Sequence, residues 1–253
     1  MPPYKAAWAR QVGRSHAATH TPCQDFVSHK SARKFSCMAL ADGAGSRQHS
    51  DVGAELAVNA TLLYLRRNFD ALYTLALTDE RACAERILAY CLKAFERKAR
   101  TMGWEVRSMG CTLMFVAHDG DRLLAGHVGD GIIAVQDEFG VTSTLSHPDN
   151  GEYVNSTVFV TEKGAVQRFT IIAREDRSTG FAVMSDGVAE SLYSRATRQP
   201  AQIAMKKIFQ WTTSSSKKKG DRILLSNIEQ AFAQKSSDDC SIGVMVRRPT
   251  ASS

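Results

Sequence analysis

The feature that most limits the fold of this chain is a run of short apolar segments between residues 110 and 184, with helical patterns before and after it. Asp119-Gly120 joins two of these segments, and because both residues tolerate positive φ, the pair is typical of a β-hairpin turn. Consecutive antiparallel strands with helices grouped around them indicate an α+β sandwich, because an alternating βαβ fold would place a helix between successive strands.

Local patterns predict where the individual elements lie. Strands are predicted at residues 34–41, 111–118, 122–128, 132–136, 141–145, 157–160, 166–173, 181–184 and 240–247. A first helix is predicted from residue 50, followed by a linking segment at 68–77 and a second helix at about 79–100 with Thr78 as its N-cap. Further helices are predicted at 188–193, about 200–212 and about 221–234, and a polar surface loop at 214–220.

The composition is that of an ordinary soluble protein, with 43% hydrophobic and 23% charged residues. We expect one domain at 1–247 and a short tail at 248–253.

Six cysteines without a CxxC pair argue against a zinc site or a disulfide framework and favour a reducing cytoplasm. The N-terminal residues have no apolar signal region, and no stretch reaches the about 20 apolar residues that cross a bilayer, so no membrane partner is expected.

The formal net charge of +6 could favour acidic or phosphorylated partners, or nucleic acid. The basic residues are dispersed, however, and the densest run, Lys217-Lys218-Lys219, is typical of a solvated loop. Because aromatic residues are not interleaved with basic patches, no specific nucleic-acid partner is expected. No heptad run indicates oligomerisation, so we expect a monomer.

Acidic residues recur beside glycine where predicted strands end. These sites are Asp42, Asp130 and Asp186, with Asp238 and Asp239 before the last strand and Asp25 near the N-terminus. A single Asp-Gly pair is most often only a turn. A strand end fixes the direction of a carboxylate, however, and hard divalent cations prefer oxygen ligands, so the repeated pattern favours a carboxylate metal centre.

Six segments in sequence order resemble the motifs of the PPM/PP2C metal-dependent phosphatases, particularly the bacterial branch, over nearly the whole chain. They are Gly13-Arg-Ser-His16 with Pro22-Cys-Gln-Asp25-Phe26, Ala41-Asp-Gly-Ala-Gly45, Gly110-Cys-Thr-Leu113, Val128-Gly-Asp-Gly131, Ser185-Asp-Gly-Val188 and Asp238-Asp-Cys-Ser241. The resemblance implies two packed, mainly antiparallel sheets flanked by helices, an αββα sandwich.

The resemblance also implies roles for particular residues. Asp42 would bridge two Mn²⁺ or Mg²⁺ ions, the Gly43 carbonyl would complete one of them, and Asp186 and Asp238 would bind the other. Gln24 and Asp25 would hold metal-bound waters. Asp130 and Glu190 would form a weaker third site. Asp239 stands where the family usually has Asn, so the choice of ligand between Asp238 and Asp239 stays open, with Asp238 favoured.

Two positions depart from the family pattern. The Arg that grips the substrate phosphate is replaced by His20, which lacks the bidentate fork of a guanidinium; Arg14 or His16 are the alternatives. The His that many members carry two residues after the bridging aspartate is Ala44 here.

The resemblance predicts an enzyme that hydrolyses phosphoserine and phosphothreonine in proteins, with water activated at a two-metal centre as the direct nucleophile. The alternative is a catalytically silent phosphate-binding or regulatory module on the same fold, which the His20 and Ala44 departures favour. A nucleic-acid binder is a weaker third hypothesis. The choice between manganese and magnesium and the physiological substrate stay open.

Overall fold

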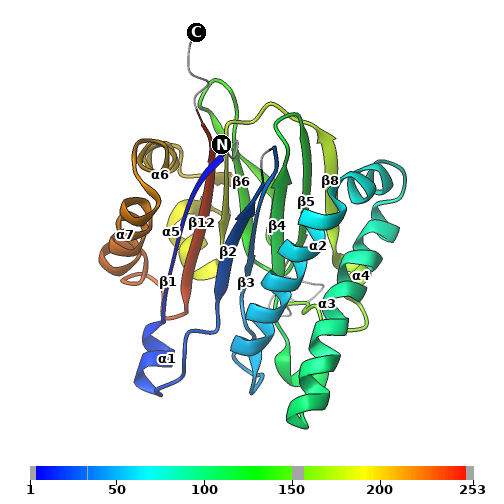
Figure 1. The fold of residues 1–253 in the computed structure, drawn as a ribbon. Coiled ribbons are helices and arrows are strands. Elements are labelled where there is room, and N and C mark those ends of the chain that lie inside the picture. Colours follow the sequence, from blue (N-terminus) through cyan, green and yellow to red (C-terminus); the bar gives the residue numbers. More distant parts are fainter. Residues whose placement is uncertain (1–3, 33, 150–156, 249–253) are drawn as a thin grey trace.

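Two antiparallel sheets lie face to face at the centre of the molecule, as the computed structural model of residues 4–32, 34–149 and 157–248 shows (Figure 1). The first sheet has the strand order β1 (Tyr4–Gln11), β12 (Cys240–Arg247), β9 (Gly180–Met184), β6 (Ile132–Gln136) and β7 (Thr142–Ser146). The second has the order β2 (Phe26–Ser31), β3 (Ser36–Ala41), β4 (Leu113–His118), β5 (Arg122–Val128) and β8 (Thr170–Glu175). A separate short ribbon pairs β10 (Tyr193–Ser194) with β11 (Gln199–Pro200).

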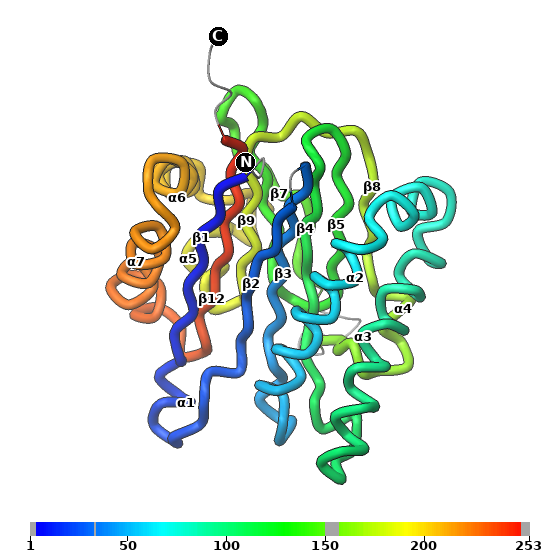
Figure 2. The backbone as a smooth tube through the Cα atoms, in the orientation of Figure 1, coloured from blue at the N-terminus to red at the C-terminus, as the bar shows by residue number. Residues whose placement is uncertain are grey.

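Helices cover the outer face of each sheet (Figures 1 and 2). The second sheet carries α2 (Ser50–Thr78) and α3 (Glu80–Met102), with η1 (Val106–Met109) and α4 (Ala165–Arg168) nearby. The first sheet carries α5 (Asp186–Leu192), α6 (Gln202–Ser214), α7 (Lys217–Asn227) and the π-helical turn η2 (Ile228–Phe232). The short α1 (Arg14–Ala18) follows β1. The predicted αββα sandwich is therefore confirmed.

Alternation along β3 explains how two of the three apolar layers form. Met38 and Leu40 point into the core between the two sheets, where they join Phe181 of β9. Cys37 and Ala39 point the other way, into the core under α2 and α3. Both faces of the strand are buried, which is why it reads as a continuous apolar run.

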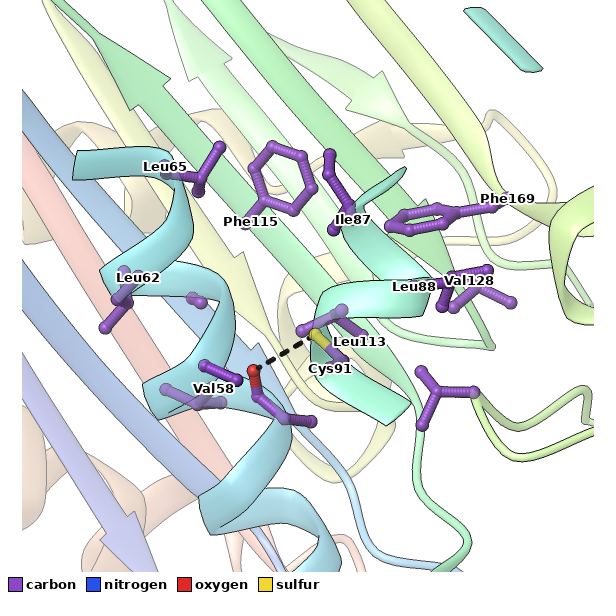
Figure 3. Packing of buried hydrophobic residues seen from close by; sticks show 14 of the residues in the cluster. Val58, Leu62, Leu65, Ile87, Leu88, Cys91, Leu113, Phe115, Val128 and Phe169 are labelled. Carbon is purple, nitrogen blue, oxygen red and sulfur yellow. Dashed lines mark hydrogen bonds between the residues drawn. The ribbon is translucent and has the colours of Figure 1, made fainter. Parts of the chain in front are cut away.

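The core under the helices is filled mainly by large aliphatic and aromatic side chains. Figure 3 shows Leu62 and Leu65 of α2, Ile87 of α3, and Phe115 of β4 in this layer. Burying each such side chain contributes about 1.5–3 kcal/mol, so this layer holds the helix pair on the sheet. No helix in the described part of the chain is both long and apolar enough to span a membrane.

The predicted linking segment at 68–77 is wrong. It belongs to α2, which continues to Thr78 through a kink at Asn68. Leu72 and Ala76 are buried against the same core as the first half of the helix, so tertiary packing continues it. The N-cap of α3 is Asp79, whose side chain accepts a hydrogen bond from the Ala82 N–H, in place of the predicted Thr78.

Four other predictions of local structure differ from the observed elements. Residues 157–160 form no strand, although Val160 is buried, and the predicted strand at 166–173 is divided between α4 and β8. The predicted loop at 214–220 is largely the first turn of α7. The predicted helix at 221–234 ends as α7 at Asn227 and continues as η2.

Candidate metal centre

The sheet topology brings the acidic residues to one end of the sandwich. Asp42 follows β3 directly, Asp130 comes two residues after β5, and Asp186 two residues after β9. Asp25 immediately precedes β2, and Asp238 comes two residues before β12. Because neighbouring strands are antiparallel, the ends of some strands and the beginnings of others meet at the same edge, which is the end that carries α1 (Figure 1).

A cleft of about 260 Å³ lies at this end of the molecule. Its lining includes the predicted site residues Asp42, Gly43, Asp130, Asp186, Asp238 and His16. A neighbouring hollow of about 290 Å³ shares Asp130 and Asp186 with the cleft and adds Glu190 and Arg195. Four carboxylates that are up to 196 residues apart in the chain therefore face one cleft.

Burial, together with electrostatic repulsion from neighbouring carboxylates, raises the pKa values of two residues of the cleft, Asp42 and Asp186. Burial, with Asp25 and Asp186 close by, holds the pKa of Asp42 well above its usual range. Burial and the charges of Asp130 and Asp238 raise the pKa of Asp186 to about 7. Like charges are held close together here, so the cleft is a place where a divalent cation would be stabilised.

Asp25 lies beneath the cleft and is only 1% exposed. Burial and the charge of Asp239 raise its pKa to about 8. Neither carboxylate oxygen of Asp25 has a hydrogen-bond partner among the described residues, and the same holds for Oδ1 of Asp186. Unpaired buried carboxylate oxygens are costly, and a cation or its ordered waters would satisfy them.

The donor set fits a hard divalent cation that keeps much of its water shell. In the described part of the chain, no group of three or more His, Cys, Asp or Glu side chains is placed so that it could hold a metal ion by itself. The carboxylates instead surround the cleft. Mg²⁺ is usually held by only one or two carboxylates together with several waters, so this arrangement suits it, and oxygen donors also suit Mn²⁺.

Backbone contacts fix the position of Asp42. Its N–H donates to Thr112 Oγ1 at 2.9 Å, and the Thr112 N–H donates to the Asp42 carbonyl at 2.8 Å. Gly43 follows in a crowded position, where a Cβ would lie 2.7 Å from the Gln24 carbonyl oxygen. The absence of a side chain therefore allows the loop after β3 to lie against the segment that carries Gln24 and Asp25.

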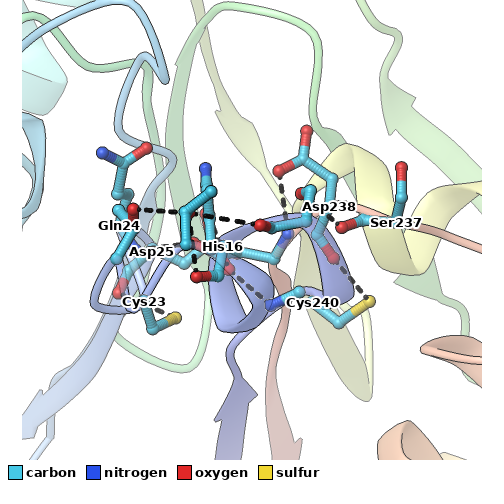
Figure 4. A network of polar contacts seen from close by, with 12 residues as sticks. His16, Cys23, Gln24, Asp25, Ser237, Asp238 and Cys240 are labelled. Carbon is cyan, nitrogen blue, oxygen red and sulfur yellow. Dashed lines mark hydrogen bonds and ion pairs between the residues drawn. The ribbon is translucent and has the colours of Figure 1, made fainter.

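Asp238 and Asp239 occupy different environments. Asp238 is exposed and lines the cleft, whereas Asp239 is 2% exposed. The two carboxylate oxygens of Asp239 accept the N–H groups of Gly13 and Gln24, both at 2.6 Å. Asp239 therefore ties α1 and the loop before β2 to β12. Figure 4 shows this region from close by, with His16, Gln24 and Asp238 labelled.

The three candidates for binding the substrate phosphate lie in different places. His16 lines the cleft, and its Nδ1 lies 3.1 Å from Asp239 Oδ1. Arg14 is exposed, and its Nη2 lies 3.4 Å from the Ser236 carbonyl oxygen. His20 is exposed just after α1, at φ 56°. Neither Arg14 nor His20 lines the cleft.

Other residues at the site were given no role in the sequence analysis. Thr112 belongs to a motif that was recognised there, so its position next to Gly110-Cys111 was an available signal. Thr157 lines the cleft and donates to Asp130 Oδ2 at 2.6 Å. Arg195 lines the neighbouring hollow. Thr157 and Arg195 lie in irregular segments whose spacing carries no periodic signal.

Comparison with known proteins shows relatives of one kind. Serine/threonine-protein phosphatase 3 of Escherichia coli (strain K12) is 30% identical over 191 residues, which are 73% of this chain and 74% of the relative. The catalytic domain of the serine/threonine protein phosphatase PstP, solved with two manganese ions, superposes with a TM-score of 0.66 at 17% identity, covering 97% of this chain and 98% of the other. RsbX, solved in complex with magnesium, superposes with a TM-score of 0.59 at 14% identity, covering 96% of this chain and 95% of the other.

The model of the family described as protein phosphatase 2C matches residues 12–228, which include the strand-end aspartates as far as Asp186. The two solved structures share the sandwich of sheets and helices with this chain. The family match covers most of the chain, and the relative from Escherichia coli agrees with it. The chain therefore belongs to the protein phosphatase 2C family.

Proposed function

We propose that this protein is a metal-dependent phosphatase that hydrolyses phosphoserine and phosphothreonine in proteins. The observation that carries the proposal is the cleft in which Asp42, Asp186 and Asp238 converge, with raised pKa values at Asp42 and Asp186. Two Mn²⁺ or Mg²⁺ ions would lower the pKa of water and neutralise charge on the phosphoryl group. The solved relatives that contain manganese and magnesium support the choice of ions.

The residues of the cleft have distinct proposed roles. Asp42, Gly43, Asp186 and Asp238 all line the cleft, which supports two neighbouring ion positions with Asp42 shared. Asp25 beneath the cleft would order water through its two unpaired oxygens, assisted by Gln24. Asp130 and Glu190, which line the neighbouring hollow, are the proposed donors of a weaker third site.

His16 is the proposed contact for the substrate phosphate, because it lines the cleft and Arg14 and His20 do not. Asp239 lies beside Nδ1 and orients the ring. Ala44, also in the lining, offers no group that could protonate the leaving oxygen, so water or another side chain has that role. We expect phosphorylated proteins as substrates, action by a monomer in the cytoplasm, and no nucleic-acid or membrane partner.

The test is phosphate release from an aryl phosphate and from a phosphothreonine peptide, with Mn²⁺ and Mg²⁺ titrated separately. Activity should require the metal and disappear with EDTA. Asp42→Asn should abolish it, whereas Asp121→Asn, an exposed change at the far β4–β5 hairpin, should leave it intact. Metal-independent activity, or full activity in Asp42→Asn, would overturn the proposal.

The same assay separates the second candidate, a silent phosphate-binding module. The buried Ala44 and the exposed His20, which occupy the two positions that depart from the family, are the observations that favour it. Metal binding measured by calorimetry, with no hydrolysis of either substrate, would select this alternative.

A further inference from the structure

A second polar cavity, of about 410 Å³, lies on the side of the first sheet that carries α6 and α7. It is formed by the first half of β1 and by the junction between α6 and α7, whereas α1 and the catalytic cleft follow the other end of β1 (Figure 1). The two linings share no residue. Lys5, Lys217 and Arg248 line the second cavity, and none of the Asp and Glu residues that the structure describes does.

The N-terminus of α7 faces this cavity and has an unusual sequence. Lys217, Lys218 and Lys219 occupy its first turn, which contains no acidic residue. Positive side chains are unfavourable there, because the partial charge at a helix N-terminus is also positive. Ser216 at the N-cap makes no side-chain capping bond, so the first N–H groups lack the usual side-chain acceptor. A bound anion would remove both unfavourable features.

Two further polar groups in the cavity lack partners. Ser215 is 7% exposed and lines the cavity, and its hydroxyl has no hydrogen-bond partner among the described residues. The buried Nε2 of His29, also in the lining, has none either. Burial and the charge of Lys217 lower the pKa of His29 to about 4, so the neutral ring adds no charge at pH 7. Both groups could donate a hydrogen bond to an oxyanion.

The walls of the cavity are held in place by close contacts. Gly220 of α7 packs so tightly on β1 that a Cβ there would lie 2.9 Å from the Cβ of Ala7. The Asp221 carboxylate accepts a hydrogen bond from the backbone N–H of Trp8 at 2.9 Å, and it also binds Lys217 Nζ at 2.6 Å. The same Lys217 ammonium lies 3.5 Å from the centre of the Trp8 ring. Asp221 is thus a carboxylate next to the cavity, whereas the cationic side chains of Lys5 and Lys217 lie in its lining.

We propose that this cavity is an anion site that binds a phosphoryl dianion through the first N–H groups of α7, the Ser215 hydroxyl and the Lys217 ammonium. A phosphoryl group matches these donors, because it has several acceptor oxygens and favours helix N-termini and basic side chains. The dianion is either free phosphate or the phosphorylated side chain of a peptide. The site does not depend on the proposed catalytic activity.

The test uses the ring of Trp8 as a local probe. The full-length protein, labelled with 5-fluorotryptophan and kept in EDTA at constant ionic strength, is titrated with inorganic phosphate and observed by ¹⁹F NMR. The signal of Trp8, assigned with Trp8→Phe, should shift saturably, while that of Trp104, which stacks on His49, should stay in place. Lys217→Gln and Ser215→Ala should each weaken binding by about tenfold. Lys235→Gln removes an equal charge outside the lining and should not.

The unchanged Trp104 signal shows that each variant is folded. The proposal is overturned if the Trp8 signal does not shift saturably, or if folded Lys217→Gln and Ser215→Ala bind phosphate as tightly as the parent protein. A phosphoserine peptide, with its unphosphorylated form as control, separates the two sources of the dianion. Tighter binding of the phosphopeptide than of free phosphate assigns the site to a phosphorylated side chain, and equal or weaker binding assigns it to free phosphate. Loss of hydrolysis in the metal assay would leave this result unaffected.

Discussion

At the residue scale, adjacent aspartates have separate tasks because their side chains point to opposite environments. Asp238 faces the cleft, and Asp239 accepts two backbone N–H groups in the interior. Asp238→Asn should lower activity by about 100-fold or more, with little change in stability, because a proposed metal ligand is lost. Asp239→Asn should lower the free energy of unfolding by about 1–3 kcal/mol, because an amide has only one acceptor oxygen.

Urea unfolding without metal, together with metal-dependent phosphate release, measures both effects. The assignment of Asp238 as ligand would be wrong if Asp238→Asn kept full activity. A stable Asp239→Asn would show that the buried contacts of that carboxylate contribute little.

His127 makes stability depend on pH. It is 3% exposed, and burial lowers its pKa to about 4, with Asp149 opposing the shift. Between pH 6.5 and 4 the unfolded chain binds the proton more readily, so the stability that the neutral ring contributes above pH 6.5 is lost as pH falls. Between pH 7 and pH 5, the free energy of unfolding of His127→Gln should therefore fall by about 1–2 kcal/mol less than that of the parent protein. Urea unfolding at the two pH values measures the difference; equal losses in both proteins would contradict it.

At the element scale, the beginning of α2 is held against η1 by Gly53. A Cβ at Gly53 would lie 2.0 Å from the Met109 carbonyl oxygen. Gly53→Ala should lower the free energy of unfolding by about 1–3 kcal/mol, because this overlap exceeds the gain in helix propensity. Activity should fall too, since η1 leads into Thr112, which fixes Asp42.

Gly164→Ala is the matched control, because no atom lies within 4 Å of the position that its Cβ would take. Thermal unfolding and phosphate release should distinguish the two variants. Equal stability of the two variants would show that α2 shifts to accommodate the new methyl group without a loss of free energy of unfolding.

At the scale of the whole molecule, the core between the sheets holds the two halves together. Leu40 is fully buried there. Leu40→Ala should lower the free energy of unfolding by about 2–5 kcal/mol. Ile203→Ala, at a position 78% exposed, should change it by less than about 0.5 kcal/mol. The midpoints by far-UV circular dichroism and by tryptophan fluorescence should shift together, because the core is shared. A shift seen by only one probe would show that the layers unfold separately.

Local sequence was sufficient to predict the limits of those elements whose apolar pattern is strong. The limits of β5, β6 and β12 agree with the predicted ones, because these strands are apolar runs bounded by turn residues. The edge strands β1 and β2 were missed. β1 is only partly buried, and it is defined by pairing with β12, in which Tyr4 lies opposite Arg247. A local sequence pattern cannot indicate that a strand pairs with another strand so far along the chain.

The sequence by itself determined the family of this protein, because its six motifs, with aspartates at strand ends, occur in the order typical of that family. The tertiary structure decided which side chains reach the cleft. It places Asp238, which the sequence only favoured over Asp239, in the lining, and it places His16 there in preference to Arg14 and His20. It also shows that the lysines of the predicted loop at 214–220 form the first turn of α7. The physical reason is that residue type and period are local properties, whereas orientation and burial depend on contacts between segments far apart in the chain.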